Sequence, residues 1–267
     1  MKLDELTVAI RNQDITSTLK LQEEAGALIG EVRALTLKPG ELPYKIPSEF
    51  ANLPRLRGRA TVKCILSRDP SSKKTFLLPD GSRTKDVELI LVIDGYHAPL
   101  TGGNFIDLVQ RKFYDGMSIQ SVGDLIVQTG KPESGTVNGF IDPNTKEKRT
   151  IPLELFYKKD KEPTYGYTSD DDMRATESFT LPFQAYGALG MDYVIEEEEG
   201  VNSGSSEFWF LKWDQNLLAP SRNTLDGSHS CFGYVVEGAD ILSQVERGDK
   251  IVSLRVLEGS ENFSPKA

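Results

Sequence analysis

The sequence holds few of the residues on which several classes of protein depend. Of its 267 residues, two are cysteine, two are histidine and two are tryptophan. Cys64 and Cys231 lie too far apart in the chain to form the clustered ligand set of a structural zinc site. We interpret them as two free thiols in strands, with a single long-range disulfide as the alternative.

Long apolar runs and a basic patch are also missing. No stretch approaches the roughly 18 consecutive apolar residues of a membrane-spanning helix. Residues 1–4 do not begin the apolar region of a signal peptide. We therefore expect a mature form or a cytosolic chain that is peripheral to a membrane at most. The net charge is −9, from 40 acidic and 31 basic residues, and the basic residues are scattered. This distribution argues against a nucleic-acid partner.

A helical segment is expected at the start of the chain. From Leu3 to Leu35 apolar residues recur at helical spacing, and residues 12–14 interrupt the pattern. Asp14 is a plausible N-cap, so residues 1–36 predict a helical hairpin or one bent helix. Because so short a segment cannot bury its apolar stripe alone, the stripe needs a partner. That partner is the rest of the chain, a second copy, or helices outside this sequence, as in a truncated bundle.

Residues 37–57 are expected to form an extended linker. Their four prolines, at positions 39, 43, 47 and 54, exclude a helix. We place the domain boundary here, so that residues 58–267 form the main domain.

Short strands dominate this main domain. Residues 60–67, 87–93 and 250–257 alternate or run apolar with many β-branched side chains, and each predicts a strand. Residues 101–110 place apolar side chains on one face and predict a helix. One or two helices among many short strands predict a mainly β fold built as a closed antiparallel barrel.

Five short motifs occur in a fixed order along the chain. Residues 98–105 read APLTGGNF and are followed by FYDG at 113–116 and QTG at 128–130. Residues 204–210 read GSSEFWF, and residues 225–233 read LDGSHSCFG. Together they resemble the cyclophilins, the peptidyl-prolyl cis-trans isomerases, over about residues 60–257. The resemblance implies an eight-stranded closed barrel capped by two helices, the first of which begins near Thr101.

Further features resemble one branch of that family. The helical start, the proline-rich linker and the phrases FIDP at 140–143 and IPLE at 151–154 are similar to multi-domain cyclophilins of the thylakoid lumen and their cyanobacterial relatives. The resemblance implies a role in protein folding in the lumen of the chloroplast thylakoid, with no cofactor and no metal.

The resemblance also implies which residues act on a prolyl bond. Rotation about an X-Pro bond takes roughly tens to hundreds of seconds unaided, because amide resonance must be broken. A catalyst holds the ring in an apolar cleft and directs a donor to the nitrogen, whose lone pair is free only in the twisted transition state. In cyclophilins an arginine is that donor. Here Ser121 takes its place, whereas Gln128 and His229 match the family's catalytic glutamine and histidine.

The cleft that would hold the proline ring is altered as well. Trp209 replaces a phenylalanine at its floor, and Asp192 replaces an alanine and would set a carboxylate beside an apolar ring. The substrate-binding positions carried over from the family are Leu125, Ile126, Met191, Asp192, Trp209, Thr224 and Leu225. Arg222 could substitute for the missing donor, although a solvated loop residue is the simpler interpretation. Residues 196–199, four glutamates, are interpreted as a solvated loop with no ligand pattern for calcium.

Two functions remain open. The first is a cyclophilin-like isomerase or prolyl-peptide binder that turns over a proline-containing client protein slowly if at all. The second is a non-catalytic assembly factor or scaffold for a subunit of a photosynthetic membrane complex. Ser121 favours the second function, and the matches at Gln128 and His229 favour the first.

Overall fold

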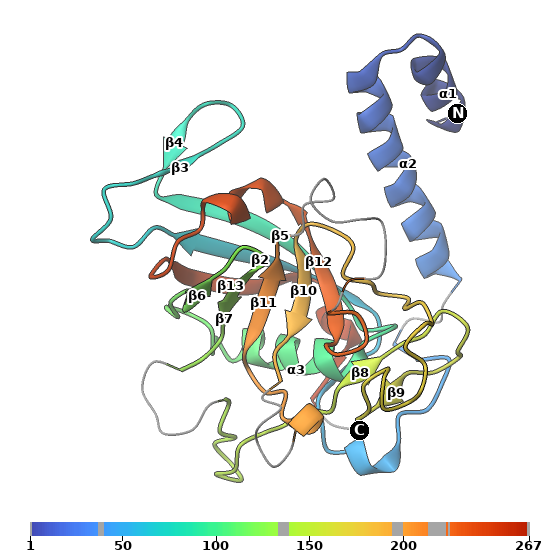
Figure 1. The fold of residues 1–267 in the computed structure, drawn as a ribbon, viewed down its shortest axis with the longest axis vertical. Coiled ribbons are helices and arrows are strands. Elements are labelled where there is room, and N and C mark those ends of the chain that lie inside the picture. Colours follow the sequence, from blue (N-terminus) through green and yellow to red (C-terminus); the bar gives the residue numbers. More distant parts are fainter. Residues whose placement is uncertain are drawn as a thin grey trace. The chain divides into compact units, whose positions relative to one another are not determined.

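The computed structural model describes residues 2–36, 40–132, 139–193, 200–212, 223 and 225–265. These residues form two compact units, Met1–Pro43 and Tyr44–Ala267. Figure 1 shows each unit as a ribbon. The predicted substrate residue Thr224, the alternative donor Arg222 and the glutamates 196–199 lie outside the described residues.

The first unit is a helical hairpin, as the sequence predicts. Helix α1 spans Lys2–Arg11 and α2 spans Ile15–Leu35. The Asp14 Oδ1 atom accepts a hydrogen bond from the Ser17 backbone N–H at 3.0 Å. Asp14 is therefore the N-cap of α2, because this bond satisfies one of the free N–H groups of the first turn.

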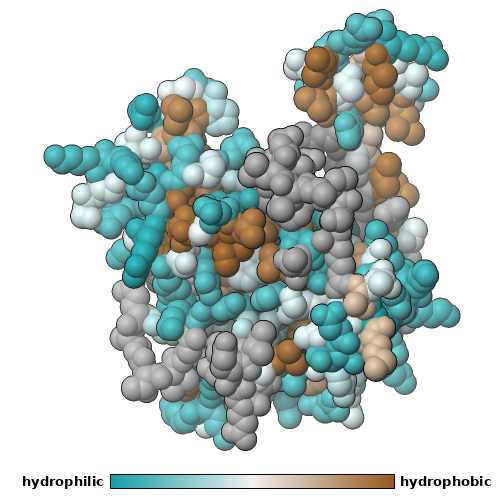
Figure 2. All heavy atoms as spheres, in the orientation of Figure 1, coloured by the Kyte–Doolittle hydropathy of each residue, from teal (hydrophilic) through white to brown (hydrophobic). Residues whose placement is uncertain are grey.

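Apolar side chains of both helices remain exposed within this unit. Only Ala9 and Ala25 are buried among its described apolar residues, and brown spheres mark exposed apolar side chains on the helices in Figure 2. The exposed set is Leu3, Val8, Ile10, Ile15, Leu19, Leu28, Ile29, Val32 and Leu35. The hairpin buries little of its own apolar stripe, and what covers the stripe stays a prediction. Within the described residues, no helix is both long and apolar enough to cross a membrane.

The second unit is built on one antiparallel sheet of eight strands that curls on itself. Across the sheet the order is β13, β2, β5, β12, β10, β11, β7 and β6. In that order the strands span Lys250–Glu258, Arg59–Ser67, Asp86–Asp94, Cys231–Glu237, Ala188–Met191, Phe208–Leu211, Ile126–Thr129 and Ser121–Val122. The mainly β class and the strands predicted near residues 60, 87 and 250 are confirmed.

The two edges of this sheet, β13 and β6, meet only along the chain that precedes β6. Ser118 forms a single bridge to Lys250. The Gly116 N–H donates to the Ile251 carbonyl at 2.7 Å, and the Ile251 N–H donates to the Met117 carbonyl at 2.8 Å. The eight-stranded curled sheet is thus observed, and the full closure of the predicted barrel is not confirmed.

Three small ribbons and short helical turns complete the unit. The ribbons pair β1 (Arg55–Leu56) with β14 (Phe263–Ser264), β3 (Phe76–Leu77) with β4 (Arg83–Thr84), and β8 (Glu154–Leu155) with β9 (Thr164–Tyr165). The 3-10 turns are η1 (Ser48–Phe50), η2 (Gly200–Asn202), η3 (Ala239–Gln244) and η4 (Ser260–Asn262).

Helix α3, Pro99–Gln110, is the only α-helix in the described part of this unit, and its residues are buried from Pro99 to Val109. It begins at a proline, whose fixed φ suits the first turn of a helix. The resemblance implies a second capping helix. In the described part of the second unit, the remaining helical segments are short 3-10 turns, so a second capping α-helix is not observed there.

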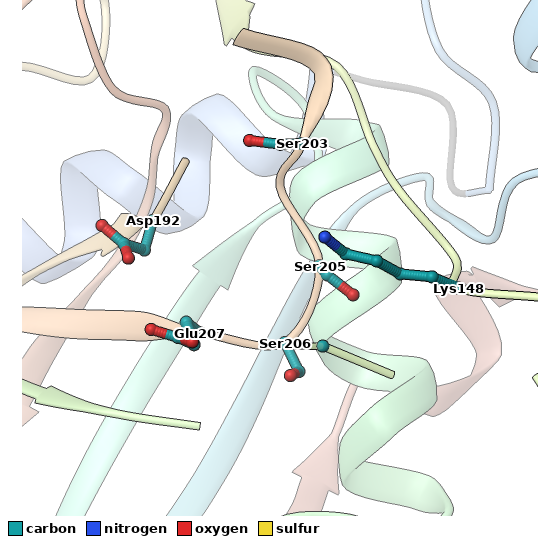
Figure 3. A pocket seen from close by; sticks show the side chains of 7 residues that line it. Lys148, Asp192, Ser203, Ser205, Ser206 and Glu207 are labelled. Atoms are coloured by element: carbon teal, nitrogen blue, oxygen red, sulfur yellow. The ribbon is translucent and has the colours of Figure 1, made fainter. Parts of the chain in front are cut away.

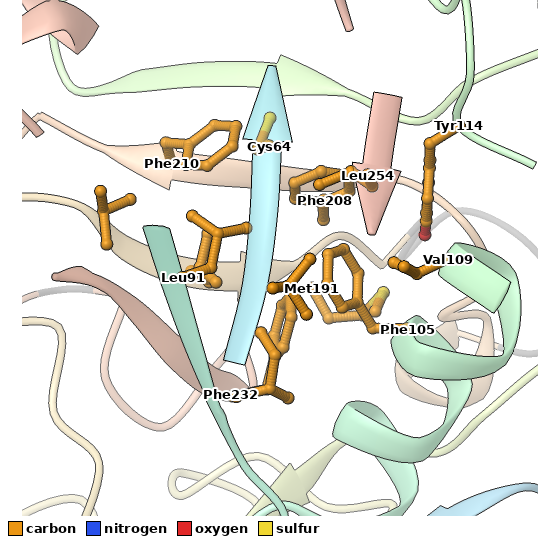
Figure 4. Packing of buried hydrophobic residues seen from close by; sticks show 14 of the residues in the cluster. Cys64, Leu91, Phe105, Val109, Tyr114, Met191, Phe208, Phe210, Phe232 and Leu254 are labelled. Carbon is orange, nitrogen blue, oxygen red and sulfur yellow. The ribbon is translucent and has the colours of Figure 1, made fainter. Parts of the chain in front are cut away.

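The core fills the inside of the curled sheet. Strand β2 alternates buried and partly exposed residues, so that every second side chain faces inward. An aromatic cluster joins α3 to the strands, with the Phe105 ring 5.1 Å from Phe208 and 5.3 Å from Phe232. Figure 4 shows these rings together with Cys64.

The two cysteines are free and buried. Cys64 lies in the inner core, whereas Cys231 belongs to a second apolar cluster built around Trp209. Burial raises the pKa of each thiol to about 12. The interpretation as two free thiols in strands is confirmed, because the two side chains belong to different clusters.

The second unit begins within the predicted linker. The Tyr44 hydroxyl donates to the Tyr96 carbonyl at 2.7 Å, and Leu56 is fully buried in the core. The boundary predicted at residue 58 is therefore corrected to the vicinity of residue 44, since residues 44–57 fold with the sheet.

Candidate functional site

Two of the predicted catalytic residues, Ser121 and Gln128, lie in one row with Trp209 on the outer face of the sheet. Ser121 in β6 pairs with Gln128 in β7, and Gln128 pairs with Trp209 in β11. Directly opposed residues of antiparallel strands share a face. That face is the outer one, because the neighbours of Trp209, Phe208 and Phe210, belong to the inner core. The structure thus brings Ser121 beside Gln128.

The apolar part of the site surrounds Trp209, which is 1% exposed. The Phe183 ring lies against the Trp209 indole, with ring centres 4.8 Å apart, and the His229 ring meets it edge-on at 5.7 Å. A Cβ at Gly190 would lie 2.1 Å from the indole, so the wide ring fits because Gly190 has no side chain. Other members of the cluster are Ala188, Leu211 and Cys231, with Ile126, Leu181, Leu225 and Tyr234 packed against it.

The polar part of the site joins Gln128 to two carboxylates. The Gln128 Nε2 atom donates to Asp192 Oδ2 at 2.9 Å and to Glu207 Oε2 at 3.2 Å. Figure 3 shows Asp192 and Glu207 facing one another in a small pocket that Lys148 also lines. The backbone joins the two acids as well, since the Asp192 N–H donates to the Glu207 carbonyl at 3.0 Å.

The two carboxylates hold excess negative charge. Burial, followed by the nearby Glu207 carboxylate, raises the pKa of Asp192 to about 6. The buried Oε1 atom of Glu207 has no hydrogen-bond partner. Asp192 therefore takes up a proton only below neutral pH, and the Gln128 amide donates to both carboxylates.

His229 is held as a neutral imidazole. Burial lowers its pKa to about 4, and its Nδ1 atom lies 3.0 Å from the Ser228 hydroxyl. Such a ring donates or accepts a hydrogen bond at neutral pH but carries no charge. By contrast, His97 lies 3.2 Å from Asp94 Oδ1 in a turn, which agrees with a structural role.

A buried carboxylate, Glu154, lies at the start of α3. It accepts hydrogen bonds from the Leu100 and Thr101 N–H groups at 3.2 and 2.9 Å and from the Thr101 hydroxyl at 2.8 Å. Burial outweighs these bonds and raises its pKa to about 7. Glu154, His97 and His229 line one small cavity of about 10 Å³, which has room for roughly one water molecule.

Two predicted substrate residues, Leu125 and Met191, are not brought to this face. Leu125 lies in the turn between β6 and β7 and is 47% exposed. Met191 is fully buried in the inner core, on the opposite side of the sheet from Gln128. Thr224 is outside the described residues. Ile126, Asp192, Trp209 and Leu225 do converge with Gln128 and His229.

No arginine is found among the described residues that line the pockets beside Gln128 and His229. Several arginines are held elsewhere in the second unit: Arg149 pairs with Asp107, Arg174 with Asp160, and Arg255 with Asp115. In the described part of the chain, no group of three or more His, Cys, Asp or Glu side chains could hold a metal ion.

Comparisons with known proteins identify the family of the chain. The sequence model of the cyclophilin-type peptidyl-prolyl cis-trans isomerase family matches residues 82–258, which is more than half of the chain. The chain belongs to the cyclophilin family.

Two curated cyclophilins are similar over most of this chain. The putative thylakoid lumen peptidyl-prolyl cis-trans isomerase sll0408 of Synechocystis sp. is 42% identical over 98% of this cyclophilin and 63% of its own length. The chloroplastic peptidyl-prolyl cis-trans isomerase CYP38 of Arabidopsis thaliana is 42% identical over 83% of the chain and 48% of its own length. The chain thus spans between about half and two thirds of these relatives. The solved Mimivirus cyclophilin is 16% identical, with a TM-score of 0.49 over 78% of this chain and 95% of its own.

Sequence reasoning missed Glu207, Phe183 and Gly190 as members of the site. The alternation of Glu207, Phe208 and Trp209 puts the acid and the indole on one face, which a strand assignment for 207–211 could have revealed. Phe183 comes from a segment with no regular secondary structure, so no periodic pattern marks it.

Proposed function

We propose that this cyclophilin binds prolyl segments of client proteins in the thylakoid lumen and isomerises them slowly. The names of the two similar cyclophilins, one thylakoid-lumenal and one chloroplastic, support this location. The observation that supports the proposal is the pairing of Ser121 with Gln128, because the family resemblance assigns the position of Ser121 to an arginine.

The missing charge bears directly on the transition state. The nitrogen of the twisted bond accepts a hydrogen bond that the planar bond cannot accept, so a donor there lowers the barrier selectively. A neutral serine hydroxyl is short and gives a weaker, uncharged bond. Loss of one preorganised donor costs about 10²- to 10³-fold in rate in other enzymes.

The ring pocket supports the same conclusion. Trp209 is wider than the phenylalanine that the family resemblance leads us to expect, and Phe183 and Leu225 already pack around it. A proline ring would compete with these side chains for the space beside the indole. Weak binding together with slow turnover is the expected result.

An isomerisation assay coupled to a protease, with a proline tetrapeptide as substrate, tests the proposal. The wild-type protein should accelerate exchange little, and Ser121→Arg should raise the rate by about 10- to 100-fold. Ser253→Arg is the matched control, because Ser253 lies on β13 of the same sheet and pairs with Ile65 of β2 rather than with a strand of the site. A wild-type rate equal to that of a full isomerase would overturn the proposal.

A second candidate function is a non-catalytic assembly factor or scaffold for a photosynthetic membrane complex. The exposed apolar side chains of α1 and α2 favour it, since they offer a docking stripe independent of the prolyl site. This function is favoured if neither the wild type nor Ser121→Arg binds or isomerises the tetrapeptide.

A further inference from the structure

Gln128 occupies the central position of the site. In the outer row it lies between Ser121 and Trp209, so a peptide that places its proline beside the indole would pass over its amide. The family resemblance leads us to expect that this amide donates to a peptide carbonyl. In the structure, the Gln128 amide donates instead to the carboxylates of Asp192 and Glu207.

Both hydrogens of the Gln128 amide are already donated. The Nε2 atom carries two hydrogens, and two carboxylates accept from it, Asp192 at 2.9 Å and Glu207 at 3.2 Å. The opposite orientation of the amide would set its oxygen against two carboxylates, so the hydrogen-bond network fixes the assignment. Hydrogen bonds to carboxylates are about twice as strong as those to neutral carbonyls. A peptide carbonyl therefore competes poorly for this donor.

We propose that Asp192 and Glu207 are positioning residues that hold the Gln128 amide away from a bound prolyl peptide. This inference rests on the proposed function, and it adds a second cause of weak binding and slow turnover to the loss of the arginine at position 121. It also predicts that restoring an arginine there recovers only part of the activity.

A double-mutant cycle tests the claim, because it measures what Gln128 contributes in each background. In the wild type, Gln128→Leu should weaken binding of a blocked, uncharged Ala-Ala-Pro-Phe peptide by less than twofold. In Asp192→Ala/Glu207→Gln the freed amide gains one neutral hydrogen bond, so the peptide should bind about threefold to tenfold more tightly. Gln128→Leu in that background should abolish the gain.

Turnover provides a readout that a merely structural role would not change. In the Ser121→Arg background, Asp192→Ala should lower KM by about the same threefold to tenfold and should raise kcat further. Asp192→Asn retains an uncharged acceptor for Gln128, so its KM and kcat should lie between those of Ser121→Arg alone and those of Ser121→Arg with Asp192→Ala. If Asp192→Ala fails to fold, Glu207→Gln alone serves as the second variant. The inference would be overturned if Gln128→Leu lowered the peptide affinity equally in the wild type and in the Asp192→Ala/Glu207→Gln background.

The pH dependence of the free wild-type protein gives an independent test. The groups that face Asp192 are Gln128, Glu207 and Lys148 in the pocket, with Tyr193 next to it in the chain. His229 stays neutral because burial lowers its pKa to about 4, and burial raises the pKa of Tyr193 above its ordinary value. When Asp192 takes up a proton near pH 6, Gln128 loses one charged acceptor.

The side-chain amide resonances of Gln128 should therefore shift with a midpoint near pH 6 in nuclear magnetic resonance spectra, and Asp192→Ala should remove the shift. Resonances that do not change between pH 8 and 5 would contradict the inference. Failure of the proposed function looks different: a peptide with alanine in place of proline would bind the wild type equally well, or the wild type would turn over as fast as a full isomerase.

Discussion

Removal of the Phe183 ring should both destabilise the protein and open the prolyl site. Phe183 is 1% exposed and lies 4.8 Å from the Trp209 ring centre. Truncation of a buried phenylalanine to alanine costs about 3–5 kcal/mol. For a domain of this size, each kcal/mol lowers Tm by roughly 2–4 °C, so Phe183→Ala should lower Tm by about 6–20 °C. The Phe183 backbone bonds to Asp226 and Asn223 do not depend on the ring.

Phe179→Ala provides the matched control. Phe179 is 5% exposed, and its ring lies 4.8 Å from Tyr157 at the same interplanar angle of 35°. The two variants should lose similar stability, but only Phe183→Ala should shift and quench the fluorescence of Trp209 and bind a proline tetrapeptide more tightly. The measurement uses a Trp213→Phe background, in which Trp209 is the one remaining tryptophan. Equal fluorescence and equal peptide affinity in both variants would refute the role assigned to Phe183.

Two further predictions concern stability. Burial raises the pKa of Glu154 from its ordinary value of 4.5 to about 7, so the folded state binds more protons than the unfolded state between these pH values. The free energy of unfolding should therefore fall by about 3 kcal/mol as pH rises through this window. Glu154→Gln should flatten that part of a curve of Tm against pH; an unchanged slope would contradict the assignment. The chain that lacks residues 1–56 should melt several degrees below the chain that lacks residues 1–43, because Leu56 and Tyr44 are lost only in the longer deletion. Equal melting of the two truncated chains would show that residues 44–57 do not stabilise the sheet.

The regular elements could be predicted because their patterns are local. The strand expected over 60–67 is observed as Arg59–Ser67, and the helix expected over 101–110 begins two residues earlier, at Pro99. Alternating apolar residues predict the strand, and a proline is favoured in the first turn of a helix, so the helix begins at Pro99. The end of the linker could not be predicted. Its prolines exclude a helix, but they do not reveal that Tyr44 and Leu56 make tertiary contacts with the second unit.

The site could be predicted only in part. Order along the chain identified Ser121, Gln128 and Trp209, and the register of β6, β7 and β11 then placed them in one row. Met191 ends β10 and Asp192 follows it, and the sequence around them does not reveal which of the two side chains faces outward. Tertiary packing alone decides that Met191 joins the core and Asp192 meets Gln128.

The most direct test of the account is the rate of cis-trans exchange in an Ala-Pro peptide, measured by exchange spectroscopy in the presence of the wild-type chain and of Ser121→Arg. We predict weak or no exchange peaks with the wild type and clear peaks with the arginine variant. Strong exchange with the wild type would contradict it, because a hydroxyl beside Gln128 would then suffice for catalysis.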